Sequence, residues 1–311
     1  MAAARFLERF LDRNKRRARF FAGTYLTKHL RLSLNFYSTI YRQPSIPEGR
    51  RDAILGRVAA EINTAVLLAA GRGKRLGALT ADTPKPLLDI AGAPLISHIV
   101  DVLAGEGAGL ANFIVVTGYL SEQIEGWAKI YQRENPRIKI TTIRQPELNG
   151  TGGAMLAAKT HLAGQPRFVF GWGDILMDRA NYPRFVHHAR DDDYDLMLAM
   201  NRVKDPFRGA AVYVDAHMRV ERLDEKPAPG TAKTQWNNAG LFATGQIIFD
   251  YLARLTPSAR CELELPAAIA QMIADGRIVR AVDMRGFWSD VGTPEDLDAA
   301  RAWFKPKRKR R

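Results

Sequence analysis

The chain has 311 residues, of which 46% are hydrophobic and 25% are charged, enough for one large domain or two ordinary ones with an apolar core. It contains no run of about 18 apolar residues, which argues against a membrane-spanning helix. The single cysteine, Cys261, excludes an internal disulfide and favours a cytoplasmic location. Because a free cysteine behaves as a small hydrophobe, we expect Cys261 to be a packing residue.

The net charge of +13 is concentrated at the two ends of the chain. Residues 1–60 hold 13 Lys and Arg against 4 Asp and Glu, and residues 305–311 hold six cations and no acid. The body, residues 61–304, is therefore close to neutral. A nucleic-acid-binding protein would need a basic or aromatic–basic pattern in the body, so we expect no specific nucleic acid partner. The basic ends remain able to contact anionic surfaces.

Residues 1–60 predict an extension that is distinct from the body. Phe6, Leu7, Phe10 and Leu11 repeat at helical spacing among arginines, which is typical of a basic amphipathic helix. Two interpretations stay open: a helical appendage packed on the domain, or a helix that binds a membrane surface or a partner. We therefore expect a basic, helical N-terminal extension over 1–60, the main domain over 61–304 and a basic tail over 305–311.

The body alternates strand-like apolar runs with helical patterns, which favours an α/β sheet. The expected strands are Ala65–Ala70, Asn112–Thr117, Ile138–Arg144, Phe168–Phe170, Leu196–Met200, Ala211–Val214 and Ile278–Val282. The expected helices are Leu95–Gly105, Ser121–Glu134, Gly153–Leu162, Tyr182–Arg190 and Leu263–Ala274.

The stretch 64–90, TAVLLAAGRGKRLGALTADTPKPLLDI, is the most informative part of the chain. A buried strand is followed by a loop with two glycines and three cations, a composition that suits a cradle for a strongly anionic group. A dinucleotide motif G-x-G-x-x-G would need glycine where Leu76 stands, and the chain has no Walker A loop. The alternative is an ordinary glycine-rich turn with solvated cations.

The same stretch resembles the signature of the nucleoside-diphosphate-sugar pyrophosphorylases (sugar-1-phosphate nucleotidyltransferases), L-A-A-G-x-G-x-R-L followed by Thr and P-K-P-L. Leu68 to Leu76 match the first part, and Pro84 to Leu87 match the last. The resemblance implies a Rossmann-like three-layer α/β domain with a mixed, mainly parallel sheet, of the nucleotide-diphospho-sugar transferase type. It implies that Arg75 and Lys85 are catalytic residues. It also implies that the nucleotide is bound by Leu68, Ala69, Gly71 and Gly73.

A second glycine-rich segment begins at Gln145 and runs through Gly150 and Thr151. A glutamine amide offers a donor and an acceptor that suit a base edge, and glycines before a helix leave backbone N–H groups free. The segment resembles the family's Q-x4-G-T element, which implies that these three residues bind the nucleotide. The alternative is a glycine-rich helix start without a ligand.

Two aspartates are candidates for a metal site. Asp174 follows the strand Phe168–Phe170, and an acid at the carboxyl end of a strand is well placed to hold Mg²⁺. Asp290 lies in W-S-D-V-G-T-P-E, which resembles the family's W-x-D-x-G-T-P-E-D. The resemblance implies that Asp174 and Asp290 together bind Mg²⁺. Thr293 in the same string predicts a helix N-cap.

Short strings further along resemble the family's sugar-phosphate elements. The Glu-Lys-Pro element corresponds here to Glu225 and Lys226, and the Asn-x-Gly element begins at Asn238. The glycine that precedes both elements is Gly209. Glu and Asn side chains can hydrogen-bond sugar hydroxyls, and a lysine can meet the sugar phosphate as a point charge.

The resemblance as a whole implies transfer of a nucleotidyl group from an NTP to a sugar 1-phosphate with release of pyrophosphate. Gln145 favours UTP or dTTP, and Cys261-Glu262-Leu263-Glu264-Leu265 is similar to the G-E-x-x-L element of glucose 1-phosphate enzymes, with Cys261 in place of glycine. Guanylyl or cytidylyl transfer to mannose 1-phosphate, heptose 1-phosphate or phosphocholine stays open. A regulatory subunit that binds sugar nucleotides, and assembly as a homo-oligomer, also stay open.

Overall fold

The computed structural model describes residues 61–305. The predicted helical extension over 1–60 lies outside the described residues, as does the basic tail after residue 305. The described chain begins at strand β1 (Thr64–Leu68), which is buried along its whole length and lies inside the sheet. No helix within 61–305 has the length and apolarity that a membrane span requires.

The sheet around β1 is parallel. β1 pairs with β4 (Asn112–Thr117) on one side and with β6 (Phe168–Trp172) on the other, and β4 pairs with β5 (Lys139–Arg144). All four strands therefore end at the same edge of the sheet, where parallel α/β proteins bind their ligands. The strand order β10-β9-β11-β6-β1-β4-β5 continues beyond β6 into an antiparallel region.

Strand β11 (Trp236–Thr244) organises that second region of the sheet. It pairs antiparallel with β6, with β8 (Leu196–Arg202) and, at one residue, with β9 (Ala210–Val214). β10 (Val220–Glu225) pairs antiparallel with β9, and β12 (Val279–Asp283) pairs parallel with β8. The mixed, mainly parallel sheet that the resemblance implied is confirmed.

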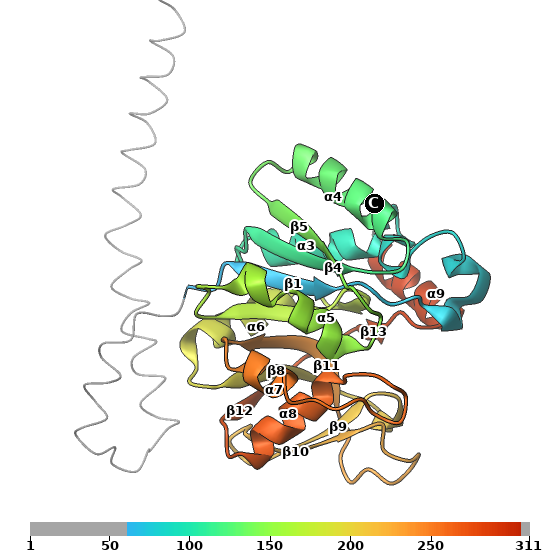
Figure 1. Ribbon diagram of the computed structural model, residues 1–311. Helices are drawn as coiled ribbons and strands as arrows, with labels where there is room; N and C mark the ends of the chain where they lie inside the picture. The colour runs from blue at the N-terminus through green and yellow to red at the C-terminus, as the bar shows by residue number, and fades with distance from the viewer. Residues whose placement is uncertain (1–60, 306–311) are drawn as a thin grey trace, which may run out of the picture. The chain divides into compact units, whose positions relative to one another are not determined.

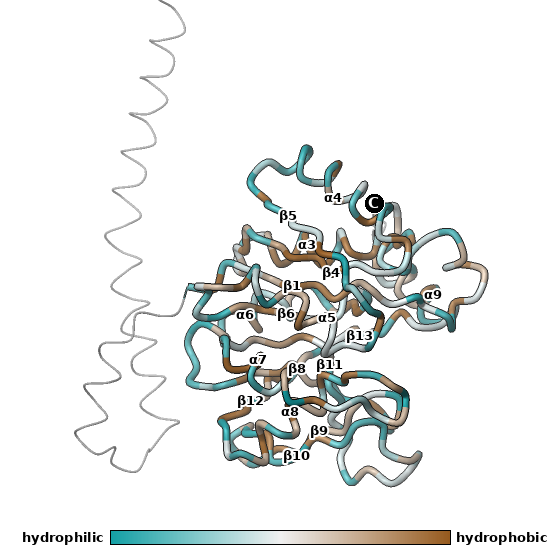
Figure 2. The backbone as a smooth tube through the Cα atoms, viewed as in Figure 1, coloured by the Kyte–Doolittle hydropathy of each residue, from teal (hydrophilic) through white to brown (hydrophobic). Residues whose placement is uncertain are grey.

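Helices cover both faces of the sheet (Figure 1), and its central strands bury side chains on both faces. Along β1, Ala65 and Leu67 enter one core, and Val66 and Leu68 enter the other. The helices on the first core are α3 (Leu95–Ala104), α4 (Ser121–Glu134), α6 (Asn181–Asp191) and α9 (Pro294–Phe304). Those on the second core are α5 (Thr151–Ala157), α7 (Ile248–Leu252) and α8 (Leu265–Ala274). The tube in Figure 2 is brown along much of the central strands and largely teal along α4.

Several short elements lie at the carboxyl edge of the parallel strands. The 3-10 segments η1 (Lys74–Thr80) and η2 (Lys85–Leu87) follow β1, and the hairpin partners β2 (Asp89–Ile90) and β3 (Ala93–Pro94) follow η2. β7 (Ile175–Met177) pairs antiparallel with β13 (Trp288–Asp290). The remaining 3-10 segments are η3 (Lys159–Leu162) and η4 (Pro206–Arg208).

The seven predicted strands and five predicted helices are present, and most boundaries differ by one or two residues. The predicted helix 153–162 is instead α5 followed by η3. Strands β10 and β11 were not predicted. β11 buries Asn237 and Asn238 and contains Gly240, residue types that are depleted in strands. A register shift in β10 breaks the alternation that sequence reasoning depends on.

The expectation that Cys261 packs in the interior is wrong, because the residue is exposed. Its backbone has a φ of +59°, in the left-handed region, and its N–H donates to the carbonyl of Ser258 at 2.8 Å. Cys261 therefore belongs to a tight surface turn and not to the core.

Candidate active site

The loop after β1 forms the predicted cradle. Its tight turn needs Gly73, whose φ is +64°, and Thr80 holds the turn by donating its hydroxyl to the carbonyl of Gly73 at 3.0 Å. The loop then enters η1, from which Lys74 and Arg75 project beside the cavity. Leu68, Ala69, Gly71 and Gly73, which the resemblance assigned to nucleotide binding, line this cavity.

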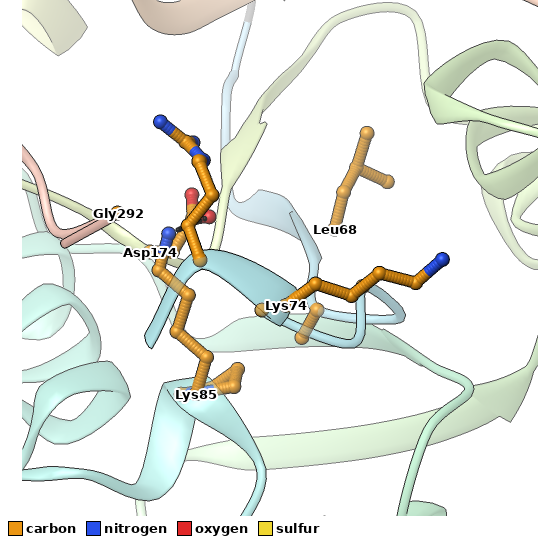
Figure 3. A pocket seen from close by; sticks show the side chains of 10 residues that line it. Leu68, Lys74, Lys85, Asp174 and Gly292 are labelled. Atoms are coloured by element: carbon orange, nitrogen blue, oxygen red, sulfur yellow. Dashed lines mark hydrogen bonds and ion pairs between the residues drawn. The ribbon is translucent and has the colours of Figure 1, made fainter. Parts of the chain in front are cut away.

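Lys85 lies at the centre of the site. Its side chain is only 7% exposed, and its ammonium donates to Asp174 Oδ2 at 2.6 Å and to Asp290 Oδ1 at 3.2 Å. Burial alone would lower the pKa of Lys85, but the two carboxylates outweigh burial, so the pKa is raised. Lys85 therefore stays protonated at neutral pH. In Figure 3 its side chain extends toward Asp174, whereas Lys74 points away from it.

The two aspartates reach Lys85 from different parts of the chain. Asp174 follows the end of β6, and Asp290 is the last residue of β13, which pairs with β7 directly after Asp174. Val291 N–H also donates to the Asp174 carbonyl at 3.2 Å. The antiparallel pairing of β7 with β13 therefore brings together two carboxylates that are more than a hundred residues apart in sequence.

Arg75 completes the charged cluster. Its guanidinium lies 3.4 Å from Asp290 Oδ2, and both side chains are partly exposed, so the pair alone contributes little to stability. A Cβ added at Gly292 would lie 2.8 Å from Arg75 Nη2, which makes glycine necessary there for the arginine to keep this position. Helix α9 begins directly after Gly292 and Thr293, and Thr293 and Asp296 form a capping box at its N-terminus. The predicted N-cap is confirmed.

Two cavities meet at this cluster. The first, of about 250 Å³, is lined by the cradle together with Lys85, Asp174 and Gly292, and we call it the nucleotide cavity. The second, of about 480 Å³, is lined by the residues predicted to bind a sugar phosphate and by Asp290, and we call it the acceptor cavity. Arg75 and Asp174 line both. The charged cluster is therefore the boundary between the two cavities.

The acceptor cavity contains the four residues that were predicted to bind a sugar phosphate. These are Gly209, Glu225, Lys226 and Asn238. Burial raises the pKa of Glu225, the nearby Glu264 adds to this shift, and the cations Lys226 and Arg260 oppose it. Lys226 Nζ lies 3.7 Å from Glu225 Oε1, and its backbone N–H donates to the Gly209 carbonyl at 2.7 Å.

The loop before α8 contributes charged groups that sequence reasoning missed. Arg260 lies 2.8 Å from Glu264 and 3.8 Å from Glu225, so one guanidinium bridges two carboxylates of the acceptor cavity. Arg208 lines the same cavity one residue before Gly209. Each arginine directly precedes a motif position in the sequence, and that adjacency is the signal that could have found them. Trp172 and Trp288 also line the cavity and were not assigned as site residues.

The predicted base-reading segment is attached to that loop. Asn149 O accepts from Leu263 N–H at 2.6 Å, Gly152 N–H donates to Leu263 O at 2.7 Å, and Thr151 Oγ1 accepts from Leu265 N–H at 3.0 Å. Thr151, predicted to bind the nucleotide, lines the acceptor cavity. Gln145 is buried and Gly150 is the N-cap residue of α5, and neither lines either cavity.

The atoms of the charged cluster that could bind a metal ion are carboxylate oxygens of Asp174 and Asp290. Within residues 61–305 there is no group of three or more His, Cys, Asp and Glu side chains arranged to hold a metal ion. Asp174 and Asp290 nevertheless contact one shared cation, the Lys85 ammonium. Two carboxylates that converge on one compact cation are a donor set that suits Mg²⁺, which usually takes its other ligands from phosphates and water.

Comparison with known proteins agrees with this geometry. The family model described as "Nucleotidyl transferase" matches residues 64–304. The chain belongs to this family. Membership confirms the resemblance found in the sequence, and the matched range contains the cradle, the charged cluster and both cavities.

Individual members of the nucleotidyl transferase family are moderately similar to this chain. The bifunctional protein GlmU of Methanococcus aeolicus is 34% identical over 233 residues, which cover 75% of this chain and 52% of that protein. The UTP–glucose-1-phosphate uridylyltransferase AglF of Haloferax volcanii is 31% identical over 238 residues, covering 76% and 94%. The chain thus spans about half the length of the GlmU relatives and nearly all of AglF.

Solved structures share the fold. A UDP-glucose pyrophosphorylase in complex with UDP-glucose superimposes with a TM-score of 0.69 at 20% identity, covering 78% of this chain and 98% of that one. The UDP-glucose pyrophosphorylase of Acinetobacter baumannii gives 0.67 at 22% identity, covering 78% and 93%. These similarities confirm the nucleotide-diphospho-sugar transferase fold.

Proposed function

We propose that this protein joins an NTP, with UTP or dTTP favoured, to a sugar 1-phosphate, giving an NDP-sugar and pyrophosphate. The observation that carries the proposal is the buried Lys85 ammonium, held by Asp174 and Asp290 where the two cavities meet. A reaction between two anions needs fixed charge of both signs at the point of contact. The relatives named as uridylyltransferase or pyrophosphorylase support the same reaction class.

The residues suit the bond changes of this reaction. An oxygen of the sugar phosphate attacks the α-phosphorus, a new P–O bond forms, and the bond to the β,γ-pyrophosphate breaks. The nucleophile is already an oxyanion, so no general base is needed, and positioning and charge stabilisation supply the catalysis. Lys85 neutralises charge that develops at the α-phosphate, and the guanidinium of Arg75 grips the leaving phosphates as a planar fork.

Asp174 and Asp290 hold Mg²⁺ in this proposal. When bound, the ion reduces repulsion between the two anionic substrates and stabilises the leaving pyrophosphate. With the ion bound, the carboxylates would hold the Lys85 ammonium less strongly, and Lys85 would be available to contact the phosphate.

The acceptor cavity supports a polyhydroxylated, singly phosphorylated acceptor. Lys226 and Arg208 offer cations for the phosphate, and Glu225 and Asn238 offer oxygens for hydroxyl groups. A glucose-type acceptor is our proposal, in a cytoplasmic protein whose single cysteine forms no internal disulfide. Homo-oligomer formation and contacts of the basic ends with anionic surfaces remain predictions.

Pyrophosphate release with Mg²⁺ across a grid of NTPs and sugar 1-phosphates tests the proposal. Release with UTP or dTTP and one sugar phosphate is the expected result. Release only with GTP or CTP would keep the reaction class and overturn the base assignment. Silence from folded protein across the grid, with phosphocholine included as an acceptor, would favour the regulatory-subunit alternative.

A further inference from the structure

The loop that forms the nucleotide cavity is fastened to the protein from outside that cavity. We call residues 70–83 the cradle loop, and its three cations are Arg72, Lys74 and Arg75. Lys74 and Arg75 line the nucleotide cavity, whereas Arg72 does not. The Arg72 guanidinium carbon lies instead 5.0 Å from the centre of the Tyr119 ring, within the range of a cation–π contact. One cation of the cradle loop is therefore used to attach the loop to its neighbour.

Tyr119 also holds the other end of the cradle loop. Its hydroxyl donates to the Ala81 carbonyl at 2.6 Å, and Gln123 Nε2 donates to the next carbonyl, that of Asp82, at 2.8 Å. Ala81 and Asp82 are exposed and lie shortly before Lys85 in the chain. Since both contacts are made to backbone carbonyls, they fix the course of the chain that leads to Lys85. A single aromatic side chain thus bridges the start and the end of the loop.

The turn that carries Tyr119 is shaped for this close approach. A Cβ added at Gly118 would lie 2.8 Å from the Ala70 carbonyl oxygen, so a glycine is needed where the two chains meet. Tyr119 N–H donates to the same carbonyl at 3.1 Å. Leu120 has a φ of +49°, in the left-handed region that residues with a Cβ rarely adopt, and α4 begins directly after it. The turn between β4 and α4 is therefore held against the beginning of the cradle loop.

Other contacts stabilise the middle of the cradle loop. Thr80 donates its hydroxyl to the Gly73 carbonyl, and Leu76 is buried in the core. These contacts shape the turn, and the two ends of the loop are held by the side chains of Tyr119 and Gln123. Neither Tyr119 nor Gln123 lines either cavity, so an effect of these side chains on a bound ligand would have to act through the loop.

We propose that Tyr119 is a positioning residue for nucleotide binding, because it clamps both ends of the cradle loop and keeps Arg75 and Lys85 in place for the triphosphate. The inference rests on the assignment of this cavity to the nucleotide in the proposed function. Without the clamp the loop would occupy further conformations. The apparent affinity for the nucleotide then falls in proportion to the fraction of molecules in the binding-competent conformation.

Calorimetric titration of the full chain with Mg²⁺ and each of UTP, dTTP, GTP and CTP, without acceptor, tests the inference. For the NTP that the wild type binds, Tyr119→Leu should weaken binding about tenfold, because it removes both the hydroxyl and the ring. Tyr119→Phe keeps the ring for Arg72 and loses only the hydrogen bond to Ala81, so it should weaken binding about threefold. Gln123→Ala, which loses the hydrogen bond to Asp82, should also weaken it about threefold.

Tyr213 provides a matched control. It is half-buried like Tyr119, the Arg222 guanidinium carbon lies 3.9 Å from its ring centre, and its hydroxyl accepts from Lys233 N–H at 3.3 Å. Tyr213 lines neither cavity. Tyr213→Leu and Tyr119→Leu should therefore lower the melting temperature by a similar amount, about 2–4 °C. Only Tyr119→Leu should weaken NTP binding by more than about twofold. Equal losses of affinity in the two variants would assign the effect to general stability and overturn the inference.

Arg72→Gln separates a clamp from a direct contact between Tyr119 and the ligand. If the Tyr119 ring acts through Arg72, this substitution should weaken NTP binding about threefold more in the wild type than in Tyr119→Leu. Equal losses in both backgrounds would show that the two residues act independently and would overturn the inference.

Unchanged NTP affinity in Tyr119→Leu would also overturn the inference, as would a wild type that binds none of the four nucleotides. Failure of the proposed function has a different signature. Nucleotide binding that depends on Tyr119, without pyrophosphate release for any acceptor, would retain this inference and refute the proposed function.

Discussion

The nucleotide cavity and the acceptor cavity meet at one charged cluster, which we call the shared wall, but they are built differently. The residues of the shared wall are Arg75, Lys85, Asp174 and Asp290. All but two of the residues that line the nucleotide cavity come from 68–75 and 85–86, and a turning backbone with glycines forms much of it. The acceptor cavity draws its lining from strands β6, β7, β10, β11 and β13 and from the loop before α8. Its charged groups are largely paired with one another, as Arg260 is with Glu264.

This difference separates a general task from a specific one. A triphosphate is recognised by backbone N–H groups and cations, which one local stretch can supply. Recognition of an acceptor needs several side chains whose mutual positions depend on the whole fold. We therefore expect substitutions at the shared wall to affect catalysis as a whole, and substitutions within the acceptor cavity to affect only acceptor affinity.

The largest expected effect is at Lys85, on the shared wall. Lys85→Ala should lower kcat by about 10³-fold, because it removes a preorganised cation from the reacting phosphate. The measurement is steady-state pyrophosphate release, with thermal melting to verify the fold. His187→Ala is the control, since His187 is exposed on α6 and its contacts are with the neighbouring surface residues His188 and Asp191. Full activity of the Lys85 variant would refute the assignment of the shared wall.

The metal comes next. Chelation of divalent ions should abolish turnover, and Asp290→Asn should lower kcat by about 10²–10³-fold while raising the Mg²⁺ concentration needed for half-maximal rate. The substitution keeps the size of the side chain and removes one charge from the pair that faces Lys85. Mg²⁺ titrations of wild type and variant provide the comparison. An unchanged Mg²⁺ dependence would exclude Asp290 as a ligand.

How well the sequence predicted the site follows from the same difference between the cavities. The residues of the cradle could be named from the sequence because their spacing is local, and the structure brings Gly73 and Lys85 to the same cavity. Arg260 was missed because only the packing of α8 against β10 reveals that it faces Glu225. Thr151 lies in the predicted segment, yet its hydroxyl accepts from Leu265, a contact that requires tertiary structure.

The fold shows the same limit. Strands with continuous apolar runs, such as β4 and β8, were predicted within one or two residues. β11 was missed although it pairs with three strands, because its buried asparagines resemble a loop. Those asparagines are paired, since Asn237 donates to Asn201 Oδ1 at 3.0 Å. Local propensity cannot reveal that a buried amide has a partner on the neighbouring strand.

Glu225 tests the acceptor cavity alone. Glu225→Gln should raise the acceptor KM about tenfold and leave the UTP KM unchanged, because it removes a charge-assisted hydrogen bond to a sugar hydroxyl. Since burial raises the pKa of Glu225, the carboxylate becomes protonated at a higher pH than an ordinary glutamate.

The wild-type acceptor KM should therefore rise as the pH falls through that raised pKa. The Gln variant, which cannot titrate there, should lack this rise. Acceptor KM measured across pH at saturating UTP provides the data. A pH profile shared by wild type and variant would assign the titration to another group.

Thr151 sharpens the boundary between the cavities. Thr151→Val keeps the shape of the side chain but removes the acceptor for Leu265 N–H. Loss of this hydrogen bond costs about 1 kcal/mol, so we expect a roughly fivefold change in the affinity that depends on it. If the hydroxyl serves the loop before α8, the acceptor KM should rise and UTP affinity should not change. A loss confined to UTP affinity would instead return Thr151 to the nucleotide cavity, as the family resemblance implied.

Cys261 has the smallest expected effect and concerns stability. A left-handed backbone, here with φ +59°, costs a residue with a Cβ about 1 kcal/mol relative to glycine. Glycine also makes the unfolded chain freer, which cancels part of this gain in stability. Cys261→Gly should therefore stabilise the fold by about 0.5 kcal/mol, measured by denaturant unfolding. Cys261→Ser keeps the Cβ and removes the thiol, so it should leave stability unchanged. Because Arg260 and Glu262 lie in the same turn, equal acceptor KM values in all three proteins would show that this turn keeps its conformation whether or not position 261 is a glycine.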